Sequence, residues 1–319
     1  MNPPLLRLGL RPLAAAALLG ASLWEPAAAQ RDSSASDTAI SQVERARPGA
    51  EFRIPLASLL APGVGQYIYG APLMGATLTG TAALGAGLYL SGDQAVLEQD
   101  LLPRHLEGQQ SVTGALLVAL AGYYSAYDAF SRGLPGLQAE GKYSFISQRA
   151  PLSEVLSAPF DPSFLKRWTT WLDLAYTAGI VTLLTASRTE PDKQYLPFKW
   201  HDGAFVAAIG YMPGTGEEAF FRGWLYPVLY QRFGQKFWLA NSVQAAIFGS
   251  LHLPQAGTFA AAIAAWAWYE GWLTRRNGWN IRESVFHHFW YNVAVSLADF
   301  LTEQRPQVAI QLPPIPLPE

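Results

Sequence analysis

The sequence of 319 residues contains no cysteine, and only 14% of its residues are charged. The absence of cysteine excludes disulfide bonds, thiolate catalysis and cysteine-bound zinc. A soluble globular chain has roughly 25% charged residues, so the low charge argues against a soluble enzyme and indicates a chain partly surrounded by lipid. The net charge of −2 gives no basic surface for nucleic acid, and we expect no nucleic-acid partner.

Hydrophobic residues make up half of the chain, and they are concentrated in long segments separated by polar ones. A helix needs about 20 residues to cross a bilayer. Segments of this kind predict membrane spans at 72–90, 112–129, 168–186, 203–231, 237–269 (divided at Pro254) and 284–298. We therefore predict an all-α fold, a polytopic helical membrane protein with about six to eight membrane helices.

The first 30 residues have the pattern of a targeting segment, because Arg7 and Arg11 precede an apolar stretch that ends in small residues. We interpret residues 1–30 as a signal peptide or, alternatively, an uncleaved N-terminal anchor. A signal of this kind looks bacterial, and together with the predicted spans it indicates a multi-pass protein of the bacterial inner membrane. The other predicted divisions are a polar linker or surface segment at 31–62, an N-terminal membrane module at 63–135, a connector at 136–164, a membrane domain at 165–302 and a proline-rich tail at 303–319.

Charged side chains within membrane segments cost roughly 2.5–3.5 kcal/mol each on insertion scales and are functional by default. On a helix, Glu218 and Arg222 are four residues apart and share a face, so they can pair, for function or for helix packing alone. Glu217 points about 100° away from Glu218 and is left without that partner, which suits a general base. Asp128 and Asp173 lie near the ends of predicted spans, and we interpret both as interfacial.

Histidine occurs in two further apolar segments. His252 lies two residues before Pro254, near a predicted helix end, where a single buried histidine is more often structural. His288 and Asn292 are four residues apart and share a helix face. Both can donate hydrogen bonds toward a developing negative charge, although a polar contact between membrane helices is the plainer alternative. His287 points elsewhere and is interpreted as a neighbour or a spare donor.

Together these motifs supply a base, a histidine partner and two oxyanion donors, which suits hydrolysis of an amide by water. The sequence has no serine in a nucleophile-elbow motif and no His-Glu-x-x-His zinc helix, so an activated water is the predicted nucleophile. Glu217, His252 and His288 are alternatively a ligand set for a divalent metal such as zinc. The spacing does not decide between metal-dependent and metal-free chemistry.

The order Glu-Glu-x-x-x-Arg, Phe-x-x-x-His and His-x-x-x-Asn resembles the CPBP family of intramembrane proteases, which is the CAAX-protease and bacteriocin-processing, or Abi, family. Phe221-Arg222-Gly223 completes the usual form of the first motif, and residues 269–274 resemble the segment before the last one. The resemblance covers roughly residues 165–302. It implies the catalytic residues Glu217, His252, His288 and Asn292, with Glu218 and Arg222 bracing the first helix.

The resemblance also implies an endopeptidase, named a metalloprotease in this family, whose partners are membrane lipid and a membrane-bound protein or peptide substrate. Eukaryotic members cleave prenylated CAAX tails, but the bacterial type of signal argues against a prenylated substrate here. Two other functions stay open. A scaffold, immunity or partner-binding member of the family would be non-catalytic, and a transporter would favour a repeated pair of broken helices, for which the sequence shows no clear repeat.

The N-terminal segment Pro62-Gly-Val-Gly-Gln-Tyr67 and the later Tyr124-Ser-Ala-Tyr-Asp128 resemble parts of bacterial membrane proteins with a Pro-Gly-x-Gly-Gln signature. They predict an accessory membrane module joined to the protease-like part. The alternative is a helix-breaking turn that leads into a glycine-rich span. Small residues throughout 72–90 predict close helix packing there.

Overall fold

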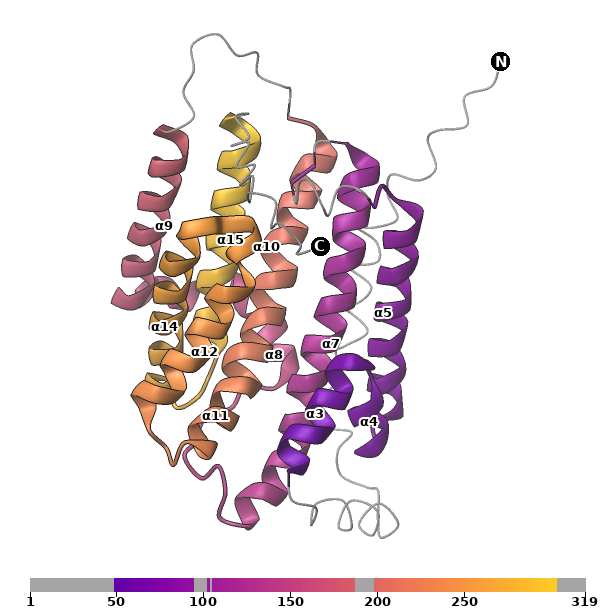
Figure 1. Ribbon diagram of the computed structural model, residues 1–319, viewed down its shortest axis with the longest axis vertical. Coiled ribbons are helices and arrows are strands. Elements are labelled where there is room, and N and C mark those ends of the chain that lie inside the picture. Colours follow the sequence, from indigo (N-terminus) through magenta and orange to yellow (C-terminus); the bar gives the residue numbers. More distant parts are fainter. Residues whose placement is uncertain (1–48, 95–101, 104, 187–197, 303–319) are drawn as a thin grey trace, which may run out of the picture.

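The computed structural model describes residues 49–94, 102–103, 105–186 and 198–302. The segments expected to be a signal (1–30) and a proline-rich tail (303–319) lie outside these residues. Within the described ranges the chain forms helices and no strand, which confirms the all-α prediction. Most of the long helices run side by side along the long axis of the molecule (Figure 1).

The α-helices, in chain order, are α3 Ala50–Leu60, α4 Val64–Ile68, α5 Pro72–Ser91, α7 Leu106–Ala139, α8 Leu152–Ser157, α9 Trp168–Ala186, α10 Trp200–Phe220, α11 Tyr226–Arg232, α12 Phe237–Leu251, α13 Leu253–Ala256, α14 Ala260–Arg276 and α15 Arg282–Thr302. Short 3-10 helices cover Ala158–Phe160, Pro162–Lys166 and Gly257–Phe259, and a π-helical turn, Phe221–Leu225, joins α10 to α11.

The helix bounds follow the hydrophobic pattern with two main exceptions. α9 has the predicted bounds, and the segment around Pro254 divides into α12 and α14 as predicted. The helix α7 is longer than the predicted 112–129, because it continues through Pro135 into the expected connector. Residues 50–60, expected to belong to a polar linker, form α3 and pack against α7, because the chain from Ile54 onward is apolar.

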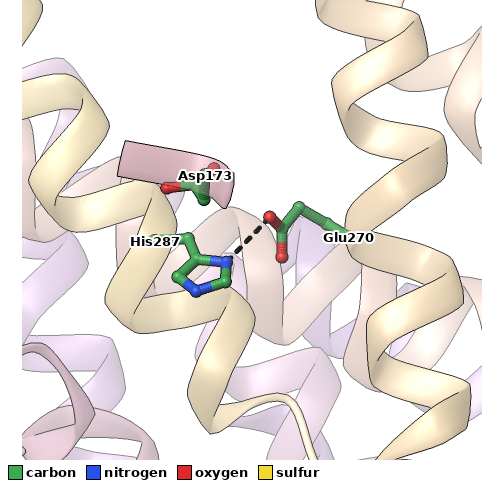
Figure 2. A group of neighbouring side chains, drawn as sticks. All are labelled: Asp173, Glu270 and His287. Carbon is green, nitrogen blue, oxygen red and sulfur yellow. Dashed lines mark hydrogen bonds and ion pairs between the residues drawn. The ribbon is translucent and has the colours of Figure 1, made fainter. Parts of the chain in front are cut away.

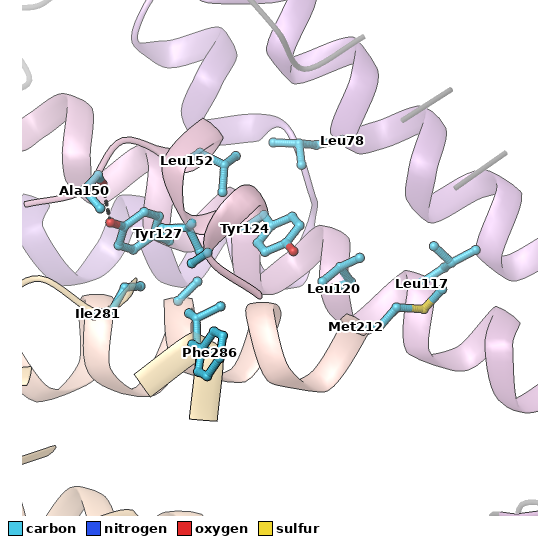
Figure 3. Close-up of a cluster of buried hydrophobic side chains, with 14 of the residues drawn as sticks. Leu78, Leu117, Leu120, Tyr124, Tyr127, Ala150, Leu152, Met212, Ile281 and Phe286 are labelled. Atoms are coloured by element: carbon cyan, nitrogen blue, oxygen red, sulfur yellow. Dashed lines mark hydrogen bonds between the residues drawn. The ribbon is translucent and has the colours of Figure 1, made fainter. Parts of the chain in front are cut away.

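The N-terminal helices share a core with the helices that carry the motifs. One cluster of buried side chains combines Leu78 of α5, Tyr124 of α7, Met212 of α10 and Phe286 of α15, as Figure 3 shows. The helix α7 also packs directly against α10. The predicted module at 63–135 is therefore packed together with the protease-like helices in one hydrophobic core.

The two N-terminal motifs meet in one buried hydrogen-bonded joint between α4 and α7. The Nε2 atom of Gln66 donates to the Ser125 carbonyl oxygen at 3.0 Å and to Asp128 Oδ2 at 2.9 Å. The Ser125 hydroxyl donates to Gln66 Oε1 at 2.7 Å and accepts from the Gly63 N–H at 2.8 Å. Asp128, expected to be interfacial, is buried, because Gln66 and Arg132 satisfy its carboxylate.

Within the described ranges, one helix, α5, is long and apolar enough to cross a membrane. The prediction of six to eight spans is therefore not confirmed. Tryptophan, tyrosine and a few charged residues lower the mean hydropathy of the helices that carry the motifs. Trp168 and Trp200, the first residues of α9 and α10, and Trp238, at the start of α12, are more than half exposed. Exposed tryptophan at helix ends is typical of a membrane–water interface.

Glycine allows α5 and α7 to pack closely, as the sequence predicted. A Cβ atom at Gly85 would lie 2.7 Å from the Gly114 carbonyl oxygen and 2.9 Å from the Val118 nitrogen. We expect Gly85→Ala to lower the free energy of unfolding by about 1–3 kcal/mol, as overpacking does. Gly80 on the same helix has open space at its Cβ position, so Gly80→Ala should be neutral or stabilise by up to about 1 kcal/mol. Equal unfolding stability of the two variants in detergent would contradict this packing.

Candidate active site

The predicted site residues lie on three helices and one turn of the C-terminal half. Glu217 and Glu218 lie in the last turn of α10, Arg222 in the π-helical turn, His252 at the C-cap of α12, and His288 and Asn292 on α15. The structure brings Glu217, Glu218, Arg222 and His288 together. His252 and Asn292 are placed around this group rather than in it.

The ion pair that the sequence spacing predicted is present and fully buried. Arg222 Nη1 donates to Glu218 Oε1 at 2.9 Å, and both side chains are 0% exposed. Arg222 Nη2 donates to the Ala267 carbonyl oxygen at 3.3 Å, and the guanidinium carbon lies 4.5 Å from the centre of the Phe248 ring. Arg222 thus connects the end of α10 to α12 and α14 as well as to Glu218.

A backbone irregularity follows the first motif. Arg222 lies in the π-helical turn Phe221–Leu225, a feature that often occurs at functional sites. Pro227 has no N–H to donate to the Gly223 carbonyl oxygen. Arg149, from the segment between α7 and α8, donates to that oxygen instead, at 2.9 Å. The segment between α7 and α8 therefore helps to hold the turn that carries Arg222.

His288 contacts both carboxylates of the first motif. Its Nδ1 lies 2.9 Å from Glu218 Oε1, and its Nε2 lies 3.9 Å from Glu217 Oε2. An ionised carboxylate only accepts hydrogen bonds, so Nδ1 carries a hydrogen and Nε2 faces Glu217. Gly214 permits this approach of α10 to α15, because a Cβ atom there would lie 2.8 Å from the Phe289 nitrogen.

Glu217 has the least satisfied carboxylate of the first motif. Its side chain is 19% exposed, and its Oε2 atom is buried without a hydrogen-bond partner among the described residues. The 3.9 Å separation from His288 Nε2 is too long for a direct hydrogen bond, but a bridging water fits such a distance. A carboxylate oxygen placed in this way can accept a proton from water.

The other two predicted residues border this group. His252 Nδ1 lies 2.8 Å from the Phe248 carbonyl oxygen, so this nitrogen donates. The Phe248 ring lies 4.7 Å from the His252 ring and 6.0 Å from the His288 ring, so both histidines contact the same aromatic side chain. Asn292 is partly exposed one helical turn after His288. Among the four predicted catalytic residues, the described structure shows one ion-pair contact. It joins Glu217 to His288.

A second buried cluster was missed by the sequence interpretation. Asp173 of α9, Glu270 of α14 and His287 of α15 each contribute a ligand atom, and these atoms lie within 4.8 Å of one another (Figure 2). Asp173, expected to be interfacial, is buried and accepts a hydrogen bond from Trp266 Nε1 at 2.8 Å. The available signal was a carboxylate within one apolar segment, a second carboxylate directly after another, and a second histidine beside His288.

The two sites differ in whether their ligand atoms lie close enough together to bind one metal ion. Within the described residues, one group of three has ligand atoms close enough for a metal site, and it consists of Asp173, Glu270 and His287. The alternative set of Glu217, His252 and His288 does not have it. We therefore assign no catalytic step to a metal at Glu217.

Comparison with known proteins gives one family match. Residues 199–294 match the family model described as type II CAAX prenyl endopeptidase Rce1-like. The match begins before α10 and ends within α15, so it includes all three motifs. No curated protein and no solved structure matches the chain.

Proposed function

The chain belongs to the CPBP family of CAAX-type endopeptidases through residues 199–294, and on this premise we propose that it is an intramembrane endopeptidase. Its proposed reaction is hydrolysis of a peptide bond in a membrane-associated protein. One observation carries the proposal: an oxygen of Glu217 that is buried without a hydrogen-bond partner in the described structure lies 3.9 Å from Nε2 of His288, whose ring Glu218 in turn holds. A base, a donor and a positioning group are thus in one place.

In the proposed reaction, Glu217 takes a proton from a water molecule, and the resulting hydroxide adds to the carbonyl carbon of the substrate. The electron pair of the carbonyl moves to its oxygen. The imidazolium form of His288 donates from Nε2 to this oxyanion, together with the amide of Asn292. When the C–N bond breaks, the proton from Glu217 passes to the leaving nitrogen. The family resemblance gives His252 the role of assisting Glu217 in activating the water.

Glu218 and Arg222 have a positioning role in this proposal. Glu218 accepts from His288 Nδ1 and from Arg222 with the same oxygen, so it fixes the orientation of the ring. A histidine whose second nitrogen is held in this way presents Nε2 in one direction. The proposed setting is a multi-pass protein of the bacterial inner membrane, with lipid against the exposed tryptophan and leucine side chains of α9 and α12.

A cleavage assay tests this function directly. The full chain would be purified, placed in liposomes, and incubated with a farnesylated CAAX peptide, with the same peptide lacking the lipid, and with a library of peptides that carry an apolar segment. We expect specific cleavage products by mass spectrometry in at least one of these sets. A folded protein that cuts none of them would contradict the peptidase proposal and favour a non-catalytic, partner-binding member of the family.

A further inference from the structure

The buried cluster of Asp173, Glu270 and His287 lies outside the site to which the peptidase reaction is assigned. Its side chains come from α9, α14 and α15 and are 2%, 0% and 1% exposed, respectively. Figure 2 shows the three side chains approaching one another between these helices. Two carboxylates and one imidazole are thus held within ligand distance of one another, where solvent does not reach them.

The hydrogen bonds of this cluster leave two carboxylate oxygens unsatisfied. Asp173 Oδ1 accepts from Trp266 Nε1 at 2.8 Å, and Glu270 Oε1 lies 3.0 Å from His287 Nδ1. The other two oxygens, Asp173 Oδ2 and Glu270 Oε2, are buried and have no hydrogen-bond partner among the residues that the structure describes. Burying such oxygens without a partner is costly, so two of them in one cluster indicate a cationic ligand.

Two arginines close to these helices are engaged by other carboxylates. Arg222 is paired with Glu218 at 2.9 Å, and Arg167 is paired with Glu283. His287 supplies at most one positive charge against the two carboxylates of the cluster. A divalent cation bound by a neutral His287 would balance both carboxylates, which a buried site requires.

The second contact of His287 suits a metal ligand. Its Nε2 lies 3.0 Å from Thr170 Oγ1, so Nε2–H can donate to that hydroxyl while Nδ1 faces the carboxylates. Metal-binding histidines almost always donate their other ring N–H in this manner. Nδ1 and Glu270 Oε1 are 3.0 Å apart, close to the roughly 3.3 Å between two ligands on a tetrahedral zinc with bonds of about 2.0 Å.

We propose that Asp173, Glu270 and His287 bind one divalent cation of the zinc type, which ties α9, α14 and α15 together. The Trp266 side chain connects this site to the proposed active site, because its indole N–H binds Asp173 and its ring lies 5.0 Å from the His288 ring. The cation stabilises the packing of the three helices and takes no part in the hydrolysis. The inference does not depend on the peptidase proposal.

Metal analysis of the full chain tests the site. The protein would be purified in detergent without chelators, exchanged against Zn²⁺ or Co²⁺, and measured for bound metal and for the visible absorption of Co²⁺. We expect about one ion per chain and a higher unfolding temperature with the metal than after chelation. Asp173→Asn and Glu270→Gln should lose the ion. Thr170→Val, which removes only the partner of Nε2, should weaken metal binding about 10–100-fold.

Glu217→Gln and His252→Gln are the matched controls, because they change carboxylate and imidazole groups of the proposed active site only. Both should keep the ion. Wild-type protein that takes up neither Zn²⁺ nor Co²⁺ would overturn the inference, whether or not the variants fold. Loss of the ion in Glu217→Gln or His252→Gln, with full retention in Asp173→Asn, would place the metal at the other site and would overturn it as well.

Discussion

Replacement of Glu217 by glutamine is expected to lower the cleavage rate by about 10²–10⁴-fold, the usual contribution of a general base. The amide keeps the size of the side chain but cannot accept the proton of the attacking water. The Glu217 side chain makes no hydrogen bond through Oε2 in the described structure and is partly exposed. The substitution should therefore leave folding intact, and the rate of product formation in liposomes measures its effect.

Glu140→Gln provides the control for this substitution. Glu140 lies at the surface, where its carboxylate pairs with Lys142 at 2.9 Å, so removing its charge should leave both cleavage and folding unchanged. Cleavage of a verified substrate by Glu217→Gln at the wild-type rate would exclude Glu217 as the base. A loss of cleavage together with a loss of thermal stability would show that Glu217 serves the fold instead.

The second large effect is expected in stability. Arg222→Met should lower the free energy of unfolding by about 3–5 kcal/mol, because it leaves the buried Glu218 carboxylate without its cation. Both partners are 0% exposed, so water cannot replace the lost charge. The same variant removes the guanidinium from the Phe248 and Trp266 rings. Unfolding of the purified protein in detergent, followed by tryptophan fluorescence, measures the loss.

Lys142→Met is the matched control for this prediction. Lys142 forms an ion pair with Glu140 of the same 2.9 Å length, but both side chains are exposed, and such pairs contribute about 0–1 kcal/mol. If Arg222→Met and Lys142→Met unfold at the same denaturant concentration, the buried pair does not stabilise the fold. In the double variant with Glu218→Gln, part of the stability should return, because the uncompensated charge is gone.

Local spacing was sufficient for those parts of the site that lie within one helix. The Glu218–Arg222 contact follows from two residues four positions apart, since the helix repeat alone brings them together. The same rule places His288 and Asn292 on one face of α15. The contact between His288 and Glu218 joins two helices, and the sequence did not predict it, because it depends on how α10 packs against α15.

The burial of isolated carboxylates could not be predicted in the same way. Asp128 and Asp173 were expected near water because each lies toward the end of an apolar segment. In the structure, Gln66 and Arg132 satisfy Asp128, and Trp266 donates to Asp173. Gln66 and Trp266 come from distant parts of the chain and reverse the preference of these carboxylates for water, and such partners are known only once the helices are packed.

The sequence by itself determined the helical class, the position of most helices and the intrahelical ion pair, because each depends on composition or on a repeat of a few residues. Tertiary structure decided that the N-terminal helices share the core of the protease-like part. It also decided that Asp173, Glu270 and His287 meet. These three residues come from three different helices. Because the chain has few charged residues, each has few polar neighbours on its own helix, and the packing between helices decides which residue becomes its partner.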